Sequence, residues 1–392
     1  MSFKRIGTSF QIYFVYSISY AKLVKDDCHS SFISVCENKM KEIYHTNKLN
    51  TKHQLIMKVL FALFLGFFFF FSALGQEDQI KKLVSEGVEL NDQGKYDEAI
   101  AKYKEALDID KNSTLANYEL AYTYLASGQY ENAIKFSKRV IDQDSDNQLG
   151  AYVTLGTSFD MLGKPDKAMK AYEEGIEKFP ESNLLYYNLA ITALNQKDYE
   201  KAEQSATNAI KYKPQHCSSH IVLAVTMQDQ KKRVKSILPL FYSLMLEPTS
   251  NRAKSNYPTL LILLNQGVER KSEKNINISV PNFADADSVY SPVELMLSLS
   301  AASKLTDTSK SEMENFVETT RSLFSIMGEL KKENKDIWWD FYVPRFNDLI
   351  QTENYEAFCY YISQSANKEE VTTWIKDHPE KMEKFGTWLK NL

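Results

Sequence analysis

Small and apolar residues recur along this chain at two spacings, one helical and one much longer. Ala99, Tyr103 and Leu107 are four residues apart, as on one face of a helix. Their stretch, GKYDEAIAKYKEALDID, returns as GQYENAIKFSKRVIDQD, GKPDKAMKAYEEGIEKF and KDYEKAEQSATNAIKYK, and more loosely as KKRVKSILPLFYSLMLE. Small residues also recur every 34 or 35 residues, at Gly87, Ala121, Gly156, Ala190 and Ala224. This period predicts a stack of helix pairs, each burying its apolar side against its neighbours.

Residues at fixed positions of each copy support this prediction. A leucine precedes the small residue at Leu120, Leu155, Leu189 and Leu223; glycines mark turns at Gly94, Gly128 and Gly163; prolines end copies at Pro180, Pro214 and Pro248. In these columns the chain resembles the tetratricopeptide repeat family, from Gln79 to about Pro248. The resemblance implies an all-α fold, an α-α superhelix of about five helix pairs. We expect residues 79–248 to form units over 80–113, 114–148, 149–182, 183–216 and 217–250.

In that family the first helices of successive units line a concave groove that binds a protein or peptide segment. Carried over, the groove residues are Val84, Val88, Asn91, Tyr118, Tyr122, Leu125, Val153, Thr157, Asp160, Tyr187, Ile191, Asn195, Ile221 and Val225. No lysine or arginine stands at these positions in copies two to four, so the family's clamp for a terminal carboxylate is missing. The groove is apolar and aromatic, which suits a helix or a hydrophobic peptide.

Residues 57–75, MKVLFALFLGFFFFFSALG, have the layout of a secretory signal peptide. Lys58 precedes an apolar run from Val59 to Leu74, and small residues lie at Ala73 and Gly75. We therefore expect an exported protein, periplasmic or secreted, cut before Gln76; the alternative is a membrane anchor that is not cut. Residues 1–56 show no repeat, and we expect a disordered, over-extended N-terminus with Met57 as the true start.

After Pro248 the period fades. Residues 251–270 are expected to form a buried closing helix, residues 271–291 a linker, and residues 292–392 an aromatic-rich helical domain. Spacing from Met313 to Leu330 predicts an amphipathic helix there. All four tryptophans lie in this last part; their simplest role is a core, whereas Trp338, Trp339, Phe341, Tyr342 and Phe346 are a possible docking patch for a partner.

Composition and motifs speak against catalysis and against nucleic acid. Without residues 1–75 the chain has a net charge of −9, whereas phosphate binding needs a basic face. No phosphate loop, His-Glu-x-x-His or Gly-x-Ser-x-Gly motif occurs. His216, Cys217 and His220 lie close together, but His220 occupies a packing position of the repeat, so no metal is expected. Cys217 and Cys359 could form one bridge, but two buried thiols are favoured.

These observations favour a non-enzymatic adaptor or assembly scaffold that binds a protein or peptide, with no cofactor and no small-molecule substrate. A second hypothesis is a structural component that self-associates and whose groove is filled by its own C-terminal helices. A membrane would be involved only through an uncut signal segment.

Overall fold

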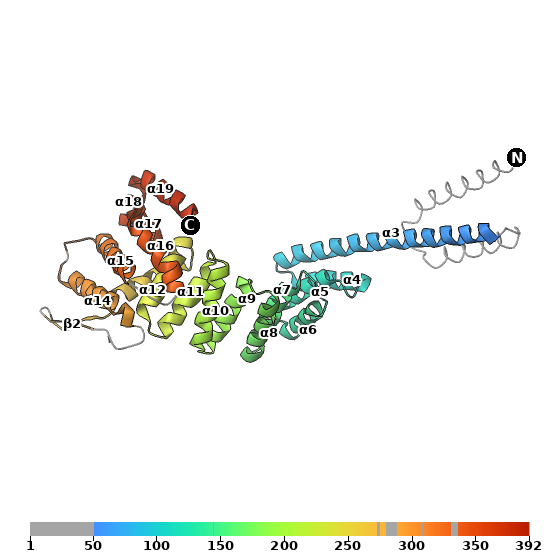
Figure 1. Cartoon of the computed structure of the whole chain (residues 1–392), viewed down its shortest axis with the longest axis horizontal. Helices are drawn as coiled ribbons and strands as arrows, with labels where there is room; N and C mark the ends of the chain where they lie inside the picture. Colours follow the sequence, from blue (N-terminus) through green and yellow to red (C-terminus); the bar gives the residue numbers. More distant parts are fainter. Residues whose placement is uncertain are drawn as a thin grey trace. The chain divides into compact units, whose positions relative to one another are not determined.

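The computed structural model describes residues 51–143, 145–272, 275–279, 288–307, 309–330 and 336–391, shown in Figure 1. The expectations for residues 1–50 lie outside these ranges. The chain divides into two compact units, one up to Gln79 and one from Ile80. Most described residues are helical, so the all-α prediction is confirmed.

Helix pairs follow one another through the repeat region. The helices are α3 (Thr51–Asp92), α4 (Tyr96–Ile109), α5 (Thr114–Ala126), α6 (Tyr130–Ile141), α7 (Gln148–Met161), α8 (Pro165–Lys178), α9 (Asn183–Asn195), α10 (Tyr199–Tyr212), α11 (Cys217–Asp229) and α12 (Arg233–Leu246). The first helices of the pairs are the part of α3 from Ile80, then α5, α7, α9 and α11. The second helices are α4, α6, α8, α10 and α12. Each packs on its neighbours in sequence (Figure 1), as expected for a superhelix of five pairs.

The turn inside each pair has one residue with left-handed backbone. Glycine supplies it in the first three pairs, with φ of 74° at Gly94, 77° at Gly128 and 67° at Gly163. Lysine stands there in the last two, with φ of 61° at Lys197 and 60° at Lys231. The glycines end these helices as their positions predicted, because a residue without Cβ adopts this conformation at no steric cost.

Beyond the repeats the structure departs from the expected boundaries. Helix α13 (Ala253–Asn265) ends before the expected 270, and a hairpin of β1 (Val268–Arg270) and β2 (Ile276–Ile278) follows. Gly267, with φ of 87°, turns the chain between helix and strand. The prediction of a helix buried on all sides was wrong, since Ile262 is 62% exposed.

The remaining helices form the C-terminal part. They are η1 (Ser288–Tyr290), α14 (Ser291–Thr306), α15 (Glu312–Glu329), a π-helical turn η2 (Trp338–Tyr342), α16 (Val343–Ile350), α17 (Asn354–Ile362), η3 (Gln364–Ala366), α18 (Glu369–Asp377) and α19 (Pro379–Lys390). Helix α15 has the amphipathic face that its spacing predicted, with Met313, Phe316 and Leu323 among its buried residues.

The C-terminal helices share one core with the fifth repeat. Every residue of α12 from Val234 to Met245 is buried, which explains why the fifth copy is so apolar. The ring of Phe241 lies 5.0 Å from Phe324, 5.9 Å from Phe346 and 6.2 Å from Phe358, measured between centroids. Helix α12 is therefore the central element of this core, which repeat periodicity alone does not indicate.

Among the described residues, none of the helices combines the length and the apolar character that a membrane crossing requires.

Candidate functional site

The first helices carry the side chains that the resemblance assigns to a groove. Tyr122 is 46% exposed and Val225 is 38% exposed, and Asn195 is also exposed. Ten are half-buried: Val88, Asn91, Tyr118, Leu125, Val153, Thr157, Asp160, Tyr187, Ile191 and Ile221. Val84 is only 4% exposed and packs in the core with Ile80 and Tyr103. Its assignment to the groove surface was wrong.

Two exposed apolar residues of this surface were missed. Met161 at the end of α7 is 58% exposed, and Leu184 in the first turn of α9 is 44% exposed. Met161 lies 34 residues before Asn195, so the two occupy equivalent positions in successive repeats. In the same way, Leu184 is equivalent to Gly150. The repeat register therefore contained the signal for Met161, since Asn195 was already assigned to the groove.

Two groove tyrosines are held in place by their neighbours. Tyr118 lies against Gly150 of the next first helix, where an added Cβ would stand 2.5 Å from ring atom Cε2. The Tyr187 ring meets the His216 ring edge-on at 4.8 Å, and Nδ1 of His216 lies 2.7 Å from Ser219 Oγ. These contacts hold the rings in place before any partner arrives, which lowers the entropy cost of binding.

Hydrogen bonds also join successive first helices. Thr123 Oγ1 donates to Asn91 Oδ1 at 2.9 Å, and Thr192 Oγ1 donates to Asp160 Oδ2 at 3.0 Å. Both bonds join residues 32 apart, so the same connection is made at two different steps of the repeat. They use polar groups of Asn91 and Asp160 to hold the surface together, and each residue keeps further capacity for a ligand.

The C-terminal helices do not fill this groove. The C-terminal helices that the structure describes pack on α12 and α13 and contact His220 of α11, and they leave Tyr122 and Val225 exposed. The alternative in which the chain's own C-terminal helices occupy the groove is therefore not what the structure contains.

The expected docking patch is mostly core. Trp338, Tyr342 and Phe346 are 1%, 0% and 2% exposed, and only Trp339 and Phe341 are half-buried. The π-helical turn η2 directs Trp338 and Tyr342 towards the fifth repeat, and Phe346 on α16 packs on Phe241 of α12. The patch was wrong for the three buried rings because they face α11 and α12, as the contact of Tyr342 with Tyr242 at 6.0 Å shows.

The cluster of His216, Cys217 and His220 serves packing. His220 is fully buried, with Nδ1 2.6 Å from Tyr342 Oη and Nε2 2.7 Å from the carbonyl oxygen of Pro214. Cys217 is buried and its thiol lies 3.6 Å from the carbonyl oxygen of Ser243. Burial raises the pKa of Cys217 to about 12, so the thiol is neutral. Cys217 and Cys359 are both free and buried.

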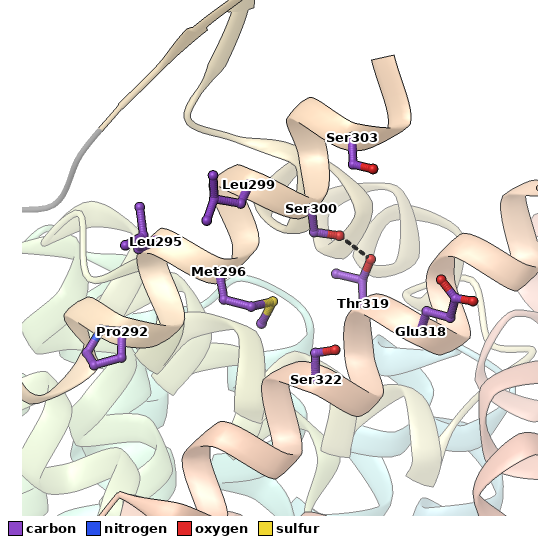
Figure 2. Close-up of a pocket in the computed structure, with 9 residues that line it drawn as sticks. All are labelled: Pro292, Leu295, Met296, Leu299, Ser300, Ser303, Glu318, Thr319 and Ser322. Carbon is purple, nitrogen blue, oxygen red and sulfur yellow. Dashed lines mark hydrogen bonds between the residues drawn. The ribbon is translucent and has the colours of Figure 1, made fainter. Parts of the chain in front are cut away.

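A hollow lies between α14 and α15 (Figure 2). Its volume is about 530 Å³, and it is lined by Pro292, Leu295, Met296, Leu299, Ser300, Ser303, Glu318, Thr319 and Ser322. A hydrogen bond of 2.7 Å between the hydroxyls of Ser300 and Thr319 joins the two helices across it. Glu318, its only carboxylate, is paired with Lys310.

A row of helix pairs with an exposed face on the first helices defines an α-solenoid, a class built to present surface. Residues 90–153 and residues 153–215 each match a model of the tetratricopeptide repeat family. The chain therefore carries tetratricopeptide repeats, which are typically protein-interaction or scaffold modules.

Curated relatives are matched over part of the chain. BBSome complex member BBS4 of Bos taurus is 27% identical over 34% of this chain and 26% of its own length. Tetratricopeptide repeat protein 8 of Caenorhabditis elegans is 25% identical over 28% of this chain and 22% of its own length. Photosystem I assembly protein Ycf3 of Parasynechococcus marenigrum is 32% identical over 20% of this chain and 47% of its own length. The chain thus spans between about a fifth and a half of these relatives.

Solved structures also resemble part of the chain. MamA is 22% identical, with a TM-score of 0.38, over 46% of this chain and 96% of its own. YrrB, described as a tetratricopeptide protein with an unusual peptide-binding site, is 18% identical, with a TM-score of 0.36, over 46% and 92%. A protein of Thermus thermophilus is 20% identical, with a TM-score of 0.40, over 47% and 99%.

Proposed function

We propose that this protein is a non-enzymatic adaptor or assembly scaffold that binds a segment of another protein in the groove of its first helices. One observation carries the proposal. In the described part of residues 80–250, the large hydrophobic side chains that stay exposed are Tyr122, Met161, Leu184 and Val225, and all four lie on first helices. The second helices expose none there. Exposed apolar side chains gathered on one face mark an interaction site, whereas scattered ones do not.

The size of these side chains fits a hydrophobic partner segment. Burial of an exposed apolar side chain contributes up to about 1.5–3 kcal/mol, so four of them can offset much of the entropy lost on association. The groove tyrosines Tyr118 and Tyr187 are already held by Gly150 and His216, as described above. Such fixed aromatic side chains are the usual anchors of protein interfaces.

A charge placed in the groove tests the proposal. In the triple variant Tyr122→Glu, Met161→Glu and Val225→Glu, each substitution falls on an exposed side chain, so the fold should persist. Partners cross-linked to the full chain in its own cells are expected to be lost from this variant. The matched control is the triple variant Ile262→Glu, Leu299→Glu and Leu305→Glu, which adds the same charge on exposed side chains outside the repeats. Partners kept by the Tyr122, Met161 and Val225 variant, or lost equally from the control, would contradict the proposal.

We further propose that the protein works outside the cytoplasm, in the cell envelope or the secreted space. The support is the layout of residues 57–75, a lysine followed by a 16-residue apolar run and small residues. Mass spectrometry of the protein from its own cells is expected to find a chain that starts at Gln76. A cytoplasmic chain that keeps residues 57–75 would contradict export.

A further inference from the structure

From the second pair onward, charge is divided unevenly between the two sets of helices, whereas the first helix of the first pair, α3 from Ile80, also contains Lys81 and Lys82. The first helices α5, α7, α9 and α11 contain no lysine and no arginine, and their acidic residues are Glu119, Asp160 and Asp229. Every second helix, from α4 to α12, contains at least two lysines or arginines. The surface that carries the exposed apolar side chains is therefore acidic, although the repeats as a whole are rich in lysine.

The acidic residues stand next to the exposed apolar ones. Glu119 precedes Tyr122 by three residues on α5, and Asp229 follows Val225 by four on α11, so each pair lies on one face of its helix. Asp160 directly precedes Met161 on α7. On α5, α7 and α11 the groove thus offers an apolar contact beside a carboxylate.

Glu119 illustrates the missing positive charge on this surface. Its side chain is half-buried, and it forms no ion pair with any residue that the structure describes. Burial raises the pKa of Glu119, and the nearby carboxylate of Asp92 raises it further. A cation placed here would reverse both effects, because it would pair with a carboxylate that is already partly removed from water.

We propose that the segment bound in the groove is cationic and amphipathic, with apolar side chains that cover Tyr122, Met161 and Val225 and with lysines or arginines that reach Glu119, Asp160 and Asp229. This inference rests on the function proposed above and adds the chemistry of the partner. A purely apolar segment would cover Glu119 without a partner charge, which costs desolvation free energy. An acidic segment would also meet three like charges.

Three synthetic peptides of equal length test the charge. Each has the same leucine face, and the polar face is lysine, glutamine or glutamate. Fluorescence anisotropy with the full chain is expected to show the lysine peptide binding at least tenfold more tightly than the glutamine peptide. This advantage is expected to shrink in 0.5 M salt, because salt screens exposed charges.

Two charge-matched variants show where the peptide binds. The groove variant Glu119→Gln, Asp160→Asn and Asp229→Asn should weaken the lysine peptide about tenfold, since three ion pairs at the surface are lost. The Asp160→Asn change leaves an amide oxygen to accept from the hydroxyl of Thr192, so this structural bond survives. The control variant Glu98→Gln, Glu131→Gln and Glu177→Gln removes three exposed charges from second helices and should leave binding unchanged.

Each outcome decides between the two proposals. Equal binding of the lysine and glutamine peptides, or equal loss in the groove and control variants, overturns the cationic partner. If that binding is still lost in the triple Tyr122, Met161 and Val225 variant, the groove function stands. If no peptide binds, or if a peptide binds the triple Tyr122, Met161 and Val225 variant as tightly as the wild type, the cationic partner and the groove function are both contradicted.

Discussion

Tyr172 occupies the space in which residue 156 would otherwise have a side chain. A Cβ added to Gly156 would stand 2.5 Å from Cζ of the Tyr172 ring, well inside van der Waals contact. Tyr172 is buried, and its hydroxyl lies 3.1 Å from Thr157 Oγ1. Gly87 and Tyr103 stand in the same relationship in the first unit, with the Cζ distance at 2.7 Å. The small residue of these units is thus required by an aromatic ring on the second helix of the same pair.

The other three units have the opposite combination of residues at these two positions, on the first helix and on the second. Where the first helix has alanine, the second helix has a residue without an aromatic ring: Ala121 with Ser137, Ala190 with Ala206, and Ala224 with Leu240. Glycine thus occurs opposite each tyrosine, and alanine occurs only opposite a side chain without an aromatic ring. The two positions therefore behave as one packing unit.

Gly156→Ala should destabilise the protein by about 1 kcal/mol. Overpacking costs about 1–3 kcal/mol, and the higher helix propensity of alanine returns only about 1 kcal/mol. Urea unfolding followed by circular dichroism measures the change. In a Tyr172→Ser background the same substitution should be neutral or stabilising, because the obstacle is gone. An equal loss in both backgrounds would show that the ring is not the cause.

Lys197→Gly should stabilise the fourth unit by about 1 kcal/mol. Lys197 has left-handed backbone, which costs a residue with a Cβ about 1–2 kcal/mol, and its side chain is exposed. Lys231→Gly should act in the same way in the fifth unit, for the same reason. The reciprocal control, Gly163→Lys, should destabilise the third unit by a similar amount. Unchanged thermal unfolding midpoints in all three variants would show that the left-handed backbone of Lys197 and Lys231 costs no stability.

The repeats could be predicted from the sequence because their determinants are local. Glycine in the turns and the 34-residue step each act within one unit or between neighbours. The step assigned Tyr122 and Val225 to an exposed face, and it could equally have assigned Met161. It could not show that Val84 is buried, since that depends on how the end of the stack packs.

The C-terminal part was harder because nothing in its sequence repeats. Aromatic residues such as Trp338 and Tyr342 are equally compatible with a core and with a docking patch, and only their contact with α11 and α12 decides. The hairpin was missed because strands of three residues carry too short a pattern to recognise. Ile262 was expected inside because the helix around it is apolar, yet its side chain is 62% exposed.

Arg233→Met should destabilise the protein by about 3 kcal/mol. The guanidinium donates to the carbonyl oxygen of Leu263 at 2.6 Å and to that of Leu264 at 3.3 Å, and it pairs with Glu294 at 3.1 Å. Its side chain is only 10% exposed, so its loss leaves a partly buried carboxylate and two helix-end carbonyls without this partner. Glu294→Gln should cost about 1 kcal/mol, because an amide oxygen still accepts from Arg233. If denaturant unfolding showed a larger loss of stability for Glu294→Gln than for Arg233→Met, this account would be contradicted.

His220 should make the packing of the C-terminal helices against the fifth repeat sensitive to acid. Burial lowers its pKa to about 3, and its neighbours Tyr342, Tyr242 and Phe341 offer no negative charge to an imidazolium. Arg345 from α16 adds positive charge. In the unfolded chain a histidine has a pKa near 6.5 and takes up a proton first. The stability that neutral His220 contributes is therefore complete above pH 6.5 and is lost as the pH falls from 6.5 towards 3.

The loss should reach about 2 kcal/mol at pH 5, since each pKa unit corresponds to about 1.4 kcal/mol. Tryptophan fluorescence reports it, because the Trp338 ring stacks on Tyr342 at 5.7 Å. His220→Gln should be less stable than the wild type at pH 7.5, through poorer packing, but should lose less free energy of unfolding between pH 7.5 and pH 5. His216→Gln is the control: its pKa is also lowered, but it is only half-buried and its slope should change less. Parallel curves for wild type and His220→Gln would exclude His220 as the acid-sensitive group.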